Sequence, residues 1–474
     1  MSIPVSTPMS RKTIVEQMRR MFNPRAVAVV GASATPGKLG YAVVANLKNG
    51  GFAGHVYPVN PGAEEILGYR CYKSLDDVPD DTDVAVVSIP AKGVASLVPS
   101  AGAKKIAALV VISSGFAETG QVEMQRELVA LARQHNVRIV GPNIYGYYYT
   151  PQKLCATFCT PFTERGGVAL TSQSGGVGMA ILGYSRSRAM GVSAIVGLGN
   201  KSDVDEDDLL EYFGQDDNTD VIAMHMEDLK DGRAFFEAAQ RVSKKKPIVV
   251  LKAGRTALGA RAAASHTAAL AGQDQVYQAA FTQAGVIRAG TLEELMDWAR
   301  ALQLLPDPAG ENVVIITGAG GLGVLLSDAC SDRGLRLMTI PPDLDKQFKE
   351  CIPPFGASGN PIDITGGEPP ETYRKAIMIG LQDPRVHALV LGYWHTILTP
   401  PMTFAKLAAE TVQAARAQGI RKPVTVALAG DTEVEEAARY LEAAGIPAYA
   451  YAAEKAVAAL AAKYQYWRHK TGAD

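Results

Sequence analysis

Short runs of Val, Ile and Ala alternate with segments of helical pattern along the whole chain of 474 residues. Most of these runs are continuously apolar, which is typical of strands that helices cover on both faces. This order of strands and helices predicts an α/β protein with parallel sheets and crossover helices. The predicted strands are Ala26–Val30, His55–Asn60, Asp83–Ile89, Ala107–Ser113, Val137–Val140, Gly167–Thr171, Ser193–Val196, Asp220–Met224, Pro247–Lys252, Asn312–Thr317, Leu335–Ile340, Ala388–Gly392 and Pro423–Leu428.

Two stretches interrupt the alternation and indicate domain boundaries. Leu304–Asn312 is rich in Pro, Gly and acidic residues, and it follows an amphipathic helix over Leu292–Leu305. Tyr148–Gly166 contains two prolines and shows no clear period. A length of about 150 residues per domain also favours about three domains. We predict an N-terminal arm over 1–20 and domains over 21–150, 151–305 and 306–474.

Charge and composition exclude several classes of protein. Lys and Arg number 47 and Asp and Glu number 48, which gives a formal net charge of −1. A nucleic-acid partner is disfavoured, because basic charge dominates affinity for the phosphate backbone. No apolar run approaches the ~20 residues of a membrane span, so we expect no membrane partner. The five cysteines are scattered, which indicates reduced thiols and a cytoplasmic location.

Two local features leave alternatives. The first 21 residues are basic and rich in Ser and Thr, but they lack the apolar core of a secretory signal. They are either a mitochondrial transit peptide or, as we favour, a short arm that leads into an amphipathic helix. Cys155 and Cys159 could ligate a metal, but no second Cys or His pair lies nearby in the sequence, so we predict no metal site.

Three predicted strands end in loops of small residues that lead into helices. The loops are VGASATPGKLG from Val30, LTSQSGGVG from Leu170 and ITGAGGLG from Ile316. Free backbone N–H groups and the helix dipole at such a helix start favour an anion. Close packing of a helix on a strand also needs glycine, so each loop alone leaves both interpretations open. Three such loops in one chain favour at least one phosphate site.

The first loop does not have the spacing of a nicotinamide-dinucleotide site. Its glycines, Gly31, Gly37 and Gly40, do not follow G-x-G-x-x-G. The second strand ends at Asn60–Pro61, without the acid that would hold the ribose hydroxyls. An oxidoreductase is therefore disfavoured. Another phosphorylated ligand is favoured, to which Lys38 would add a point charge.

The second loop and an alanine-rich segment carry groups suited to phosphoryl chemistry. The hydroxyls and amides of Ser172 and Ser174–Gly176 would fit one phosphoryl group. The segment from Ala257 to Gly272 has eight Ala, two Gly, no acid and a single histidine, His266. It is either an alanine-rich helix with an incidental histidine or a mobile covalent carrier, since histidine can act as a nucleophile.

These segments resemble the alpha subunits of the NDP-forming acyl-CoA synthetases, specifically the ADP-forming acetyl-CoA synthetase type, which are relatives of succinyl-CoA synthetase. The resemblance covers roughly residues 20–460 and rests on VGASATPGKLG, YPVNPGAEEILG, SIPAKGV, ISSGFAETG, GPNIYG, TSQSGGVG, GNKSDVDEDDLLEYF, MEDLKDGR and SHTAALAG. The run SHTAALAGQDQVYQAAFTQAGVIR is the most specific of them. The resemblance implies a Rossmann-like CoA-binding domain followed by two flavodoxin-like, doubly wound parallel-sheet domains.

The resemblance also implies a reversible reaction in three stages. Acyl-CoA and phosphate give an acyl phosphate and coenzyme A, the phosphoryl group moves to a histidine on a mobile loop, and the loop carries it to ADP on an ATP-grasp domain. This sequence has no G-x-x-x-x-G-K-[ST] loop and no ATP-grasp pattern after residue 305. We therefore predict a separate ATP-grasp beta subunit that holds ATP or ADP and Mg²⁺, in a heterotetramer of two alpha and two beta subunits.

Roles for individual residues follow from the resemblance. It implies that His266 is phosphorylated and that Glu227 orients it, although an ion pair of Glu227 with Lys230 or Arg233 is the structural alternative. The implied phosphate-binding residues are Asn143, Ser174, Gly175 and Gly176. The implied CoA-binding residues are Gly31, Ser33, Thr35, Pro36, Gly37, Lys38, Asn60, Pro61, Ser88, Ile89, Pro90, Ser113, Gly115 and Phe116. A CoA-binding regulatory protein without turnover is the alternative function, which an intact His266 and Glu227 disfavour.

The sequence departs from the family pattern in three places. Gly62 stands where a lysine is frequent, which would remove one contact to the CoA phosphates, and Ile144 stands where a cysteine is common. Tyr145 and Tyr147–Tyr149 form an unusually aromatic tract. The tract either packs the domain boundary or lines a site for a larger or aromatic acyl group. The carboxylic acid that is activated stays open.

Overall fold

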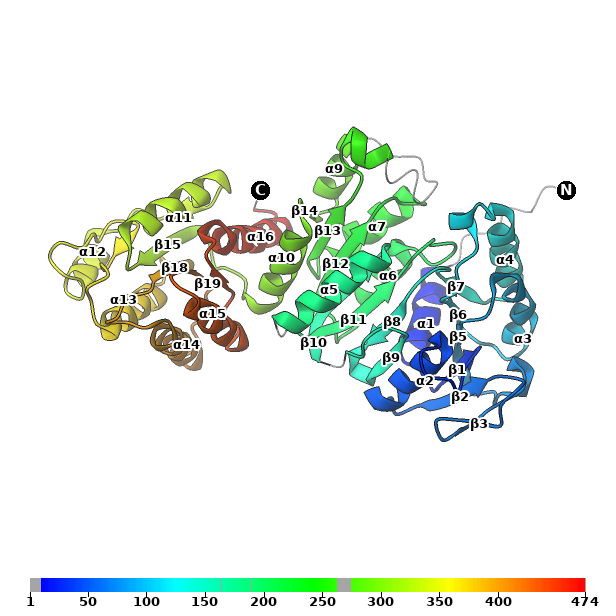
Figure 1. Ribbon diagram of the computed structural model, residues 1–474. Coiled ribbons are helices and arrows are strands. Elements are labelled where there is room, and N and C mark those ends of the chain that lie inside the picture. Colours follow the sequence, from blue (N-terminus) through cyan, green and yellow to red (C-terminus); the bar gives the residue numbers. More distant parts are fainter. Residues whose placement is uncertain (1–9, 163, 189, 262–273, 474) are drawn as a thin grey trace. The chain divides into compact units, whose positions relative to one another are not determined.

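Strands and helices alternate in the computed structural model of the chain, as the sequence predicts (Figure 1). The structure describes residues 10–473 except 163, 189 and 262–273. His266 therefore lies outside the described residues. The chain forms two compact units, residues 1–295 and 296–474, and each is described by itself.

Five parallel strands form the first sheet, in the order β2-β1-β5-β6-β7. Val27 and Val29 of β1 share a core with helices α1 and α2, whereas Ala28 and Val30 share one with α3 and α4. Both faces are thus covered, which explains the continuous apolar runs. The elements are α1 Arg11–Phe22, β1 Ala26–Val30, α2 Leu39–Gly50, β2 His55–Val59, β3 Glu65–Ile66, β4 Tyr69–Arg70, β5 Thr82–Val87, α3 Val98–Ala103, β6 Ala108–Val111, α4 Val122–Gln134 and β7 Arg138–Val140.

Seven strands form the second sheet, in the order β14-β13-β12-β10-β11-β8-β9. Its first five strands in this order are parallel, while β8 and β9 extend the edge in antiparallel pairing. The elements are β8 Gly146–Tyr149, β9 Leu154–Thr157, β10 Arg165–Ser172, α5 Gly175–Ser187, β11 Val192–Gly197, α6 Glu206–Phe213, β12 Val221–Met226, α7 Gly232–Val242, β13 Ile248–Lys252, α9 Asp274–Gln283, β14 Ile287–Ala289 and α10 Leu292–Leu304.

The hairpin of β8 and β9 occupies part of the stretch in which the sequence shows no clear period. All residues of both strands are buried, so no alternation of polar and apolar side chains marks them. A single turn of 3₁₀ helix, Thr150–Gln152, connects the two strands. Burial on both faces therefore hides this hairpin from pattern analysis.

Helix α1 packs against both sheets and joins their hydrophobic cores. Phe22 stacks on Tyr212 of α6 with ring centroids 4.7 Å apart and meets Tyr147 of β8 edge-on at 5.8 Å. The same hydrophobic core includes Val27 of the first sheet and Ile222 of the second. The first unit is thus one body with two sheets.

Backbone hydrogen bonds join the loop after β11 to the end of β7. The amides of Asn200, Ser202 and Val204 donate to carbonyls of Pro142, Gly141 and Ile139 at 3.0, 2.8 and 3.1 Å, respectively. We call this contact the seam. It consists of these three hydrogen bonds and of the ion pairs described in the next paragraph. They fix the second sheet's loop on the first sheet.

The seam also contains a buried charge cluster. The Arg138 guanidinium of β7 binds Asp203 at 2.7 Å and Asp208 at 2.6 Å, and all three side chains are less than 10% exposed. Burial works against the charge on Arg138, but the two carboxylates outweigh it and raise its pKa. Burial also raises the pKa of Asp208, an effect that Arg138 opposes. The two carboxylates thus compensate the buried guanidinium charge.

The second unit contains one parallel sheet in the order β16-β15-β18-β19-β20. Strand β16 is shorter than predicted, because β17 pairs with the other half of the same edge of β15. Between them the Asn360 amide accepts from Ile315 N and donates to Val313 O. The elements are β15 Asn312–Thr317, α11 Gly320–Asp332, β16 Arg336–Leu337, α12 Pro342–Lys349, β17 Ile362–Asp363, α13 Pro370–Gln382, β18 Ala388–Trp394, α14 Pro401–Ala417, β19 Val424–Ala429, α15 Glu433–Ala443, β20 Ala448–Ala450 and α16 Ala453–Thr471.

All three sheets reverse their strand order at the strand that precedes a small-residue loop. Strand β1 lies between β2 and β5, β10 lies between β11 and β12, and β15 lies between β16 and β18. In open α/β sheets, ligands bind at the carboxyl ends of strands at such a reversal. The topology therefore predicts that ligand sites lie at the loops after β1, β10 and β15.

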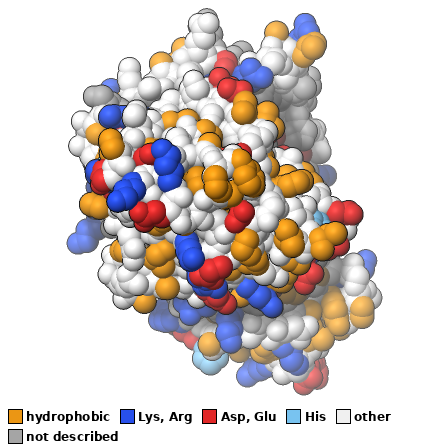
Figure 2. All heavy atoms as spheres, turned by 90° about the vertical axis from the view of Figure 1, so that its left-hand side faces the viewer, with side chains coloured by type: hydrophobic (Ala, Val, Ile, Leu, Met, Phe, Trp, Pro, Cys, Tyr) orange, Lys and Arg blue, Asp and Glu red, His pale blue; other side chains and the backbone are white. Residues whose placement is uncertain are grey.

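Large apolar side chains are exposed on the second unit. Phe355, Trp394, Ile397 and Leu398 are 78%, 42%, 97% and 60% exposed. Hydrophobic side chains also gather in the middle of the face seen in Figure 2. Exposed apolar groups of this kind are typical of interaction surfaces. Within the described ranges, none of the helices combines the length and apolar character needed to cross a membrane.

We predict that the charge cluster at the seam is essential for the stability of the first unit. Arg138→Met would leave Asp203 and Asp208 buried without their cation, and should cost about 3–5 kcal/mol of unfolding free energy. Urea unfolding followed by circular dichroism measures the change. Arg126→Met is the matched control, because Arg126 forms an exposed pair with Glu123, and it should cost less than about 0.5 kcal/mol. Equal losses in the two variants would contradict the prediction.

Candidate functional site

Two adjoining cavities open at the carboxyl edges of the two sheets of the first unit. The outer cavity has a volume of about 620 Å³ and the central cavity one of about 1180 Å³. Leu39, Ser88 and Ile89 line both, so the two cavities meet at the ends of β1 and β5. Together they form a path from the first small-residue loop to the second.

The outer cavity lies at the strand reversal between β1 and β5. Gly31 is in the left-handed region with φ +86°, and a Cβ on Gly40 would lie 2.0 Å from the Gly31 carbonyl oxygen. These two glycines let the start of α2 rest directly on the loop. The Asn60 amide donates to Ala32 O at 2.7 Å and accepts from Gly62 N at 2.8 Å, which anchors the loop to the end of β2. The predicted CoA-binding residues that line this cavity are Gly31, Ser33, Lys38, Asn60, Pro61, Ser88 and Ile89.

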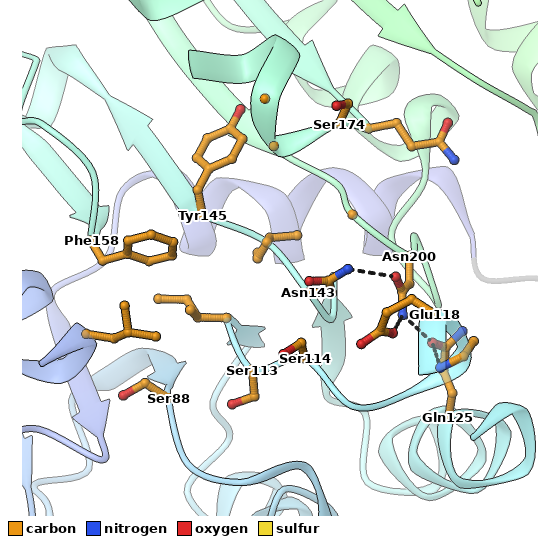
Figure 3. A pocket seen from close by; sticks show the side chains of 18 of the residues that line it. Ser88, Ser113, Ser114, Glu118, Gln125, Asn143, Tyr145, Phe158, Ser174 and Asn200 are labelled. Carbon is orange, nitrogen blue, oxygen red and sulfur yellow. Dashed lines mark hydrogen bonds between the residues drawn. The ribbon is translucent and has the colours of Figure 1, made fainter. Parts of the chain in front are cut away.

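The central cavity contains the start of α5 (Figure 3). Ser174 caps the helix by accepting from Val177 N at 3.4 Å. A Cβ added to Gly175 or Gly176 would meet nothing within 4 Å, so packing does not require glycine there. The two glycines instead leave the first-turn amides open toward the cavity. The predicted site residues that line this cavity are Ser88, Ile89, Pro90, Ser113, Asn143, Ser174, Gly175 and Gly176.

Other predicted residues do not line either cavity. Glu227 directly follows β12 and precedes the cavity-lining Asp228. The backbone amides of Gly115 and Phe116 donate to the Glu118 carboxylate. The remaining predicted residues outside the two linings are Thr35, Pro36 and Gly37. The roles of all these residues, and of His266, stay predictions.

Gln173, to which the sequence analysis assigned no role, fixes the loop after β12 to the loop after β10. Its side-chain oxygen accepts from Glu227 N at 2.7 Å, and its amide donates to Asp228 at 2.6 Å. On the other side, the Lys252 ammonium donates to the carbonyl of Glu227 at 2.7 Å. Both contacts hold the Glu227 backbone at the strand reversal between β10 and β12.

The structural alternative for Glu227 was an ion pair with Lys230 or Arg233. Arg233 binds Glu237 at 3.0 Å. The Lys230 ammonium donates to the carbonyl of Asn200 at 3.2 Å. The side chains of Lys230 and Arg233 therefore contact residues other than Glu227.

One wall of the central cavity is a polar network that crosses the seam (Figure 3). The Asn200 amide donates to Glu118 and, at 2.9 Å, to Gln125. The side-chain oxygen of Asn200 accepts from the side-chain amide of Asn143 at 3.5 Å. Burial alone would raise the pKa of Glu118, but hydrogen bonds from Asn200, Gly115 and Phe116 outweigh it and lower that pKa. Glu118 is therefore ionised and anchors the wall.

The aromatic tract serves two different purposes. The hydroxyls of Tyr147, Tyr148 and Tyr149 donate to Met21 O, Thr160 O and Asp216, respectively, within the protein interior. Tyr145 instead lines the central cavity with Phe158, and its buried hydroxyl has no hydrogen-bond partner among the described residues. Three of the four tyrosines thus pack the domain boundary, while one contributes to the site.

Neighbouring side chains lie close to three of the four glycines in the third small-residue loop, and Gly321 has open space around the position of a Cβ. A Cβ on Gly318 would lie 1.9 Å from the Tyr373 hydroxyl, and one on Gly323 would lie 3.0 Å from Thr317. Close packing therefore accounts for these glycines. In the part of the chain that the structure describes, no group of three or more His, Cys, Asp or Glu side chains could hold a metal ion.

Models of three known domain families match consecutive parts of the chain. The CoA binding domain matches residues 25–150, the succinyl-CoA ligase like flavodoxin domain matches residues 165–302, and the Ligase-CoA domain matches residues 313–472. The alpha subunit of acetate–CoA ligase (ADP-forming) I from Pyrococcus furiosus is 46% identical over 461 residues, which cover 96% of this chain and 99% of that subunit. The chain belongs to the family of ADP-forming acyl-CoA synthetases. The family is one of CoA ligases that use coenzyme A and a nucleotide, which favours the enzymatic interpretation over a regulatory binder.

Two further relatives extend the comparison within this family. The solved structure of dinucleotide forming acetyl-coenzyme A synthetase 1 from Ca. Korarchaeum cryptofilum, in complex with phosphate and ADP, matches with a TM-score of 0.93 at 43% identity, over 96% of this chain and 97% of that chain. The acetate–CoA ligase (ADP-forming) of Methanocaldococcus jannaschii is 40% identical over 450 residues. That match covers 95% of this chain but 63% of the longer relative. The predicted family and fold class are thereby confirmed.

Several cavity residues carried no binding or catalytic assignment in the sequence analysis. Glu118, Asn200 and Lys230 stand within the quoted segments ISSGFAETG, GNKSDVDEDDLLEYF and MEDLKDGR. Their position in segments that resemble the family is the one sequence signal that could have identified them as cavity residues. Their partners lie far away in the sequence, so only the fold shows what they contact.

We predict that the hydroxyls of Tyr145 and Tyr147 contribute to stability with opposite sign. Tyr145→Phe removes a buried hydroxyl without a partner, so the free chain should be unchanged or more stable by up to about 1 kcal/mol. Tyr147→Phe leaves the carbonyl of Met21 without its donor and should cost about 1–2 kcal/mol. Urea unfolding of both variants gives the comparison. A larger loss for Tyr145→Phe would contradict the assignment of its hydroxyl.

Proposed function

We propose that the chain is the alpha subunit of an ADP-forming acyl-CoA synthetase that works through an acyl phosphate and a phosphohistidine. The net reaction is carboxylic acid, CoA and ATP to acyl-CoA, ADP and phosphate. The observation that supports this most directly is the path of two adjoining cavities between the loop after β1 and the open start of α5. Such a path suits a long ligand whose phosphates and reacting thiol lie at opposite ends.

Coenzyme A would enter with its phosphates in the outer cavity. The amides at the start of α2 and the Lys38 ammonium supply donors and positive charge there. The pantetheine arm would pass Ser88 and Ile89, which line both cavities. Its thiol would then reach the central cavity.

Acyl transfer would take place in the central cavity. The CoA sulfur attacks the carbonyl carbon of the acyl phosphate, the carbon–oxygen bond to the phosphoryl group breaks, and inorganic phosphate leaves. The open amides of Gly175 and Gly176 and the hydroxyl of Ser174 would hold the phosphoryl group throughout. The apolar side formed by Tyr145 and Phe158 would receive the acyl group, which favours an apolar acid.

His266 would transfer the phosphoryl group between this cavity and the nucleotide. One imidazole nitrogen must be free for attack while an acceptor holds the other. We assign that acceptor to Glu227, whose backbone the contacts of Gln173 and Lys252 fix beside the cavity-lining Asp228. Its position after β12 places it at the strand reversal next to α5.

We further propose that the nucleotide and Mg²⁺ bind to a separate ATP-grasp beta subunit, in a cytoplasmic heterotetramer of two alpha and two beta subunits. The name of the Pyrococcus furiosus relative, an alpha subunit, supports a partner subunit, and the match covers 99% of it. The exposed side chains of Phe355, Ile397 and Leu398 suit a protein partner. We retain 1–20, 21–150, 151–305 and 306–474 as the proposed arm and domains.

Charge reversal at Lys38 tests the proposed CoA site. Lys38→Glu would place a carboxylate beside the CoA phosphates and should weaken CoA binding at least about tenfold, or about 1.4 kcal/mol. Isothermal titration of CoA into the full chain measures this. The control is Lys244→Glu, an exposed position between α7 and β13, which should leave the affinity unchanged. Equal CoA affinity of Lys38→Glu and the unchanged chain would rule out this site.

Removal of His266 tests the proposed phosphoryl carrier. With the beta subunit present, His266→Ala should reduce ATP-dependent acyl-CoA formation below about 1% of wild type, because no other nucleophile carries the phosphoryl group. Arsenate-dependent release of CoA from acetyl-CoA should persist, since that step needs no phosphohistidine. Retained ATP-dependent ligation would contradict the role of His266. ATP-dependent ligation by the alpha chain alone would contradict the separate beta subunit.

A further inference from the structure

The central cavity has a single cationic residue among the described residues that line it. Lys230 is that residue, and the other charged residues of the lining are the acids Glu118 and Asp228. A phosphoryl dianion in this cavity would meet the dipole of α5, which is worth roughly half an elementary charge. The helix start therefore leaves most of the phosphoryl charge uncompensated, and only Lys230 can add a full positive charge from these walls.

The two acids of the lining are already engaged. Glu118 accepts from the amides of Gly115 and Phe116 and from Asn200. Asp228 accepts from Gln173 at 2.6 Å and lies 3.4 Å from the buried Lys201 ammonium. Both carboxylates therefore have hydrogen-bond donors other than Lys230, although the charge of Asp228 also acts on Lys230.

The ammonium of Lys230 is directed to the seam wall of the cavity. It donates to the carbonyl of Asn200 at 3.2 Å, and the side chain of Asn200 contacts Asn143, a predicted phosphate ligand. An ammonium has three N–H donors, so this bond leaves two for a ligand. The Lys230 backbone amide donates to Asp205 at 3.4 Å, which fixes its loop from the other side.

The electrostatic surroundings of Lys230 favour an anion. Desolvation by the surrounding loops lowers its pKa and the nearby Lys201 ammonium acts in the same direction, whereas the carboxylates of Asp205, Asp228 and Glu206 oppose them. The Lys230 side chain is exposed, so its ammonium is accessible to a ligand. A bound phosphoryl group would supply a further negative charge and two or three acceptor oxygens.

We propose that Lys230 is a phosphate-binding residue of the central cavity, whose ammonium binds the phosphoryl group of inorganic phosphate or acyl phosphate opposite the start of α5. This inference rests on the proposed function and adds the cation that the phosphoryl site needs. It places the ligand between an open helix start on one side and Lys230 with Asn143 on the other.

Equilibrium dialysis of the full chain with ³²P-labelled inorganic phosphate at low ionic strength tests the proposal. Lys230→Met should weaken phosphate binding at least about tenfold, and Lys230→Arg, which keeps the charge, should stay within about threefold of wild type. Lys244→Met should bind phosphate as wild type does. CoA affinity, measured in parallel, should be unchanged in every variant and shows that the site is folded.

Three outcomes would overturn the proposal. Equal phosphate binding by wild type and Lys230→Met would remove Lys230 from the site. A loss of CoA affinity with unchanged phosphate binding would assign Lys230 to the CoA phosphates. A wild-type chain that binds no phosphate would also contradict it.

A separate assay distinguishes failure of the inference from failure of the proposed function. Arsenate-dependent release of CoA from acetyl-CoA and longer acyl-CoA thioesters is followed with the alpha chain and its beta subunit. No release by wild type would contradict the acyl-phosphate route, while a tenfold loss of phosphate binding in Lys230→Met would still support the phosphate-binding role.

Discussion

The seam between β7 and the loop after β11 is the constraint on which the site depends. Three backbone hydrogen bonds hold Asn200, Ser202 and Val204 against the end of the first sheet. The buried pairs of Arg138 with Asp203 and Asp208 lock the same loop. Because the central cavity takes walls from both sheets, its shape exists only while this loop stays in place. Desolvation offsets much of the attraction within the intact cluster, but loss of one partner would leave the others buried without compensation.

Most of the fold follows from local pattern, because buried parallel strands are continuous apolar runs. Predicted Asn312–Thr317 and Ala26–Val30 coincide with β15 and β1. The strands that pattern analysis missed are short or lie at edges, such as β17 with two residues and the β8–β9 hairpin. Their pairing is decided by neighbours far along the chain. Residues within such segments carry no period of their own.

The site could be predicted in part, for a related reason. Strand ends and helix starts are local features, so Ser174 and Lys38 were recognisable from their loops. The network of Glu118, Asn200 and Gln125 joins segments about 80 residues apart, and no local pattern indicates it. Lys230 was considered only as a partner for Glu227. In the fold its ammonium donates to the carbonyl of Asn200 instead.

The three small-residue loops show why glycine alone does not identify a ligand site. All three follow the strand at which the order of the sheet reverses, so topology does not separate them. What separates them is the volume beside the glycines. Gly175 and Gly176 at the start of α5 have open space around the position of a Cβ, whereas a Cβ on Gly320 at the start of α11 would lie 2.9 Å from the Asp363 carboxylate. Asp363 lies about forty residues further along the chain, in β17. A phosphate loop therefore depends as much on the absence of such a side chain as on its own glycines.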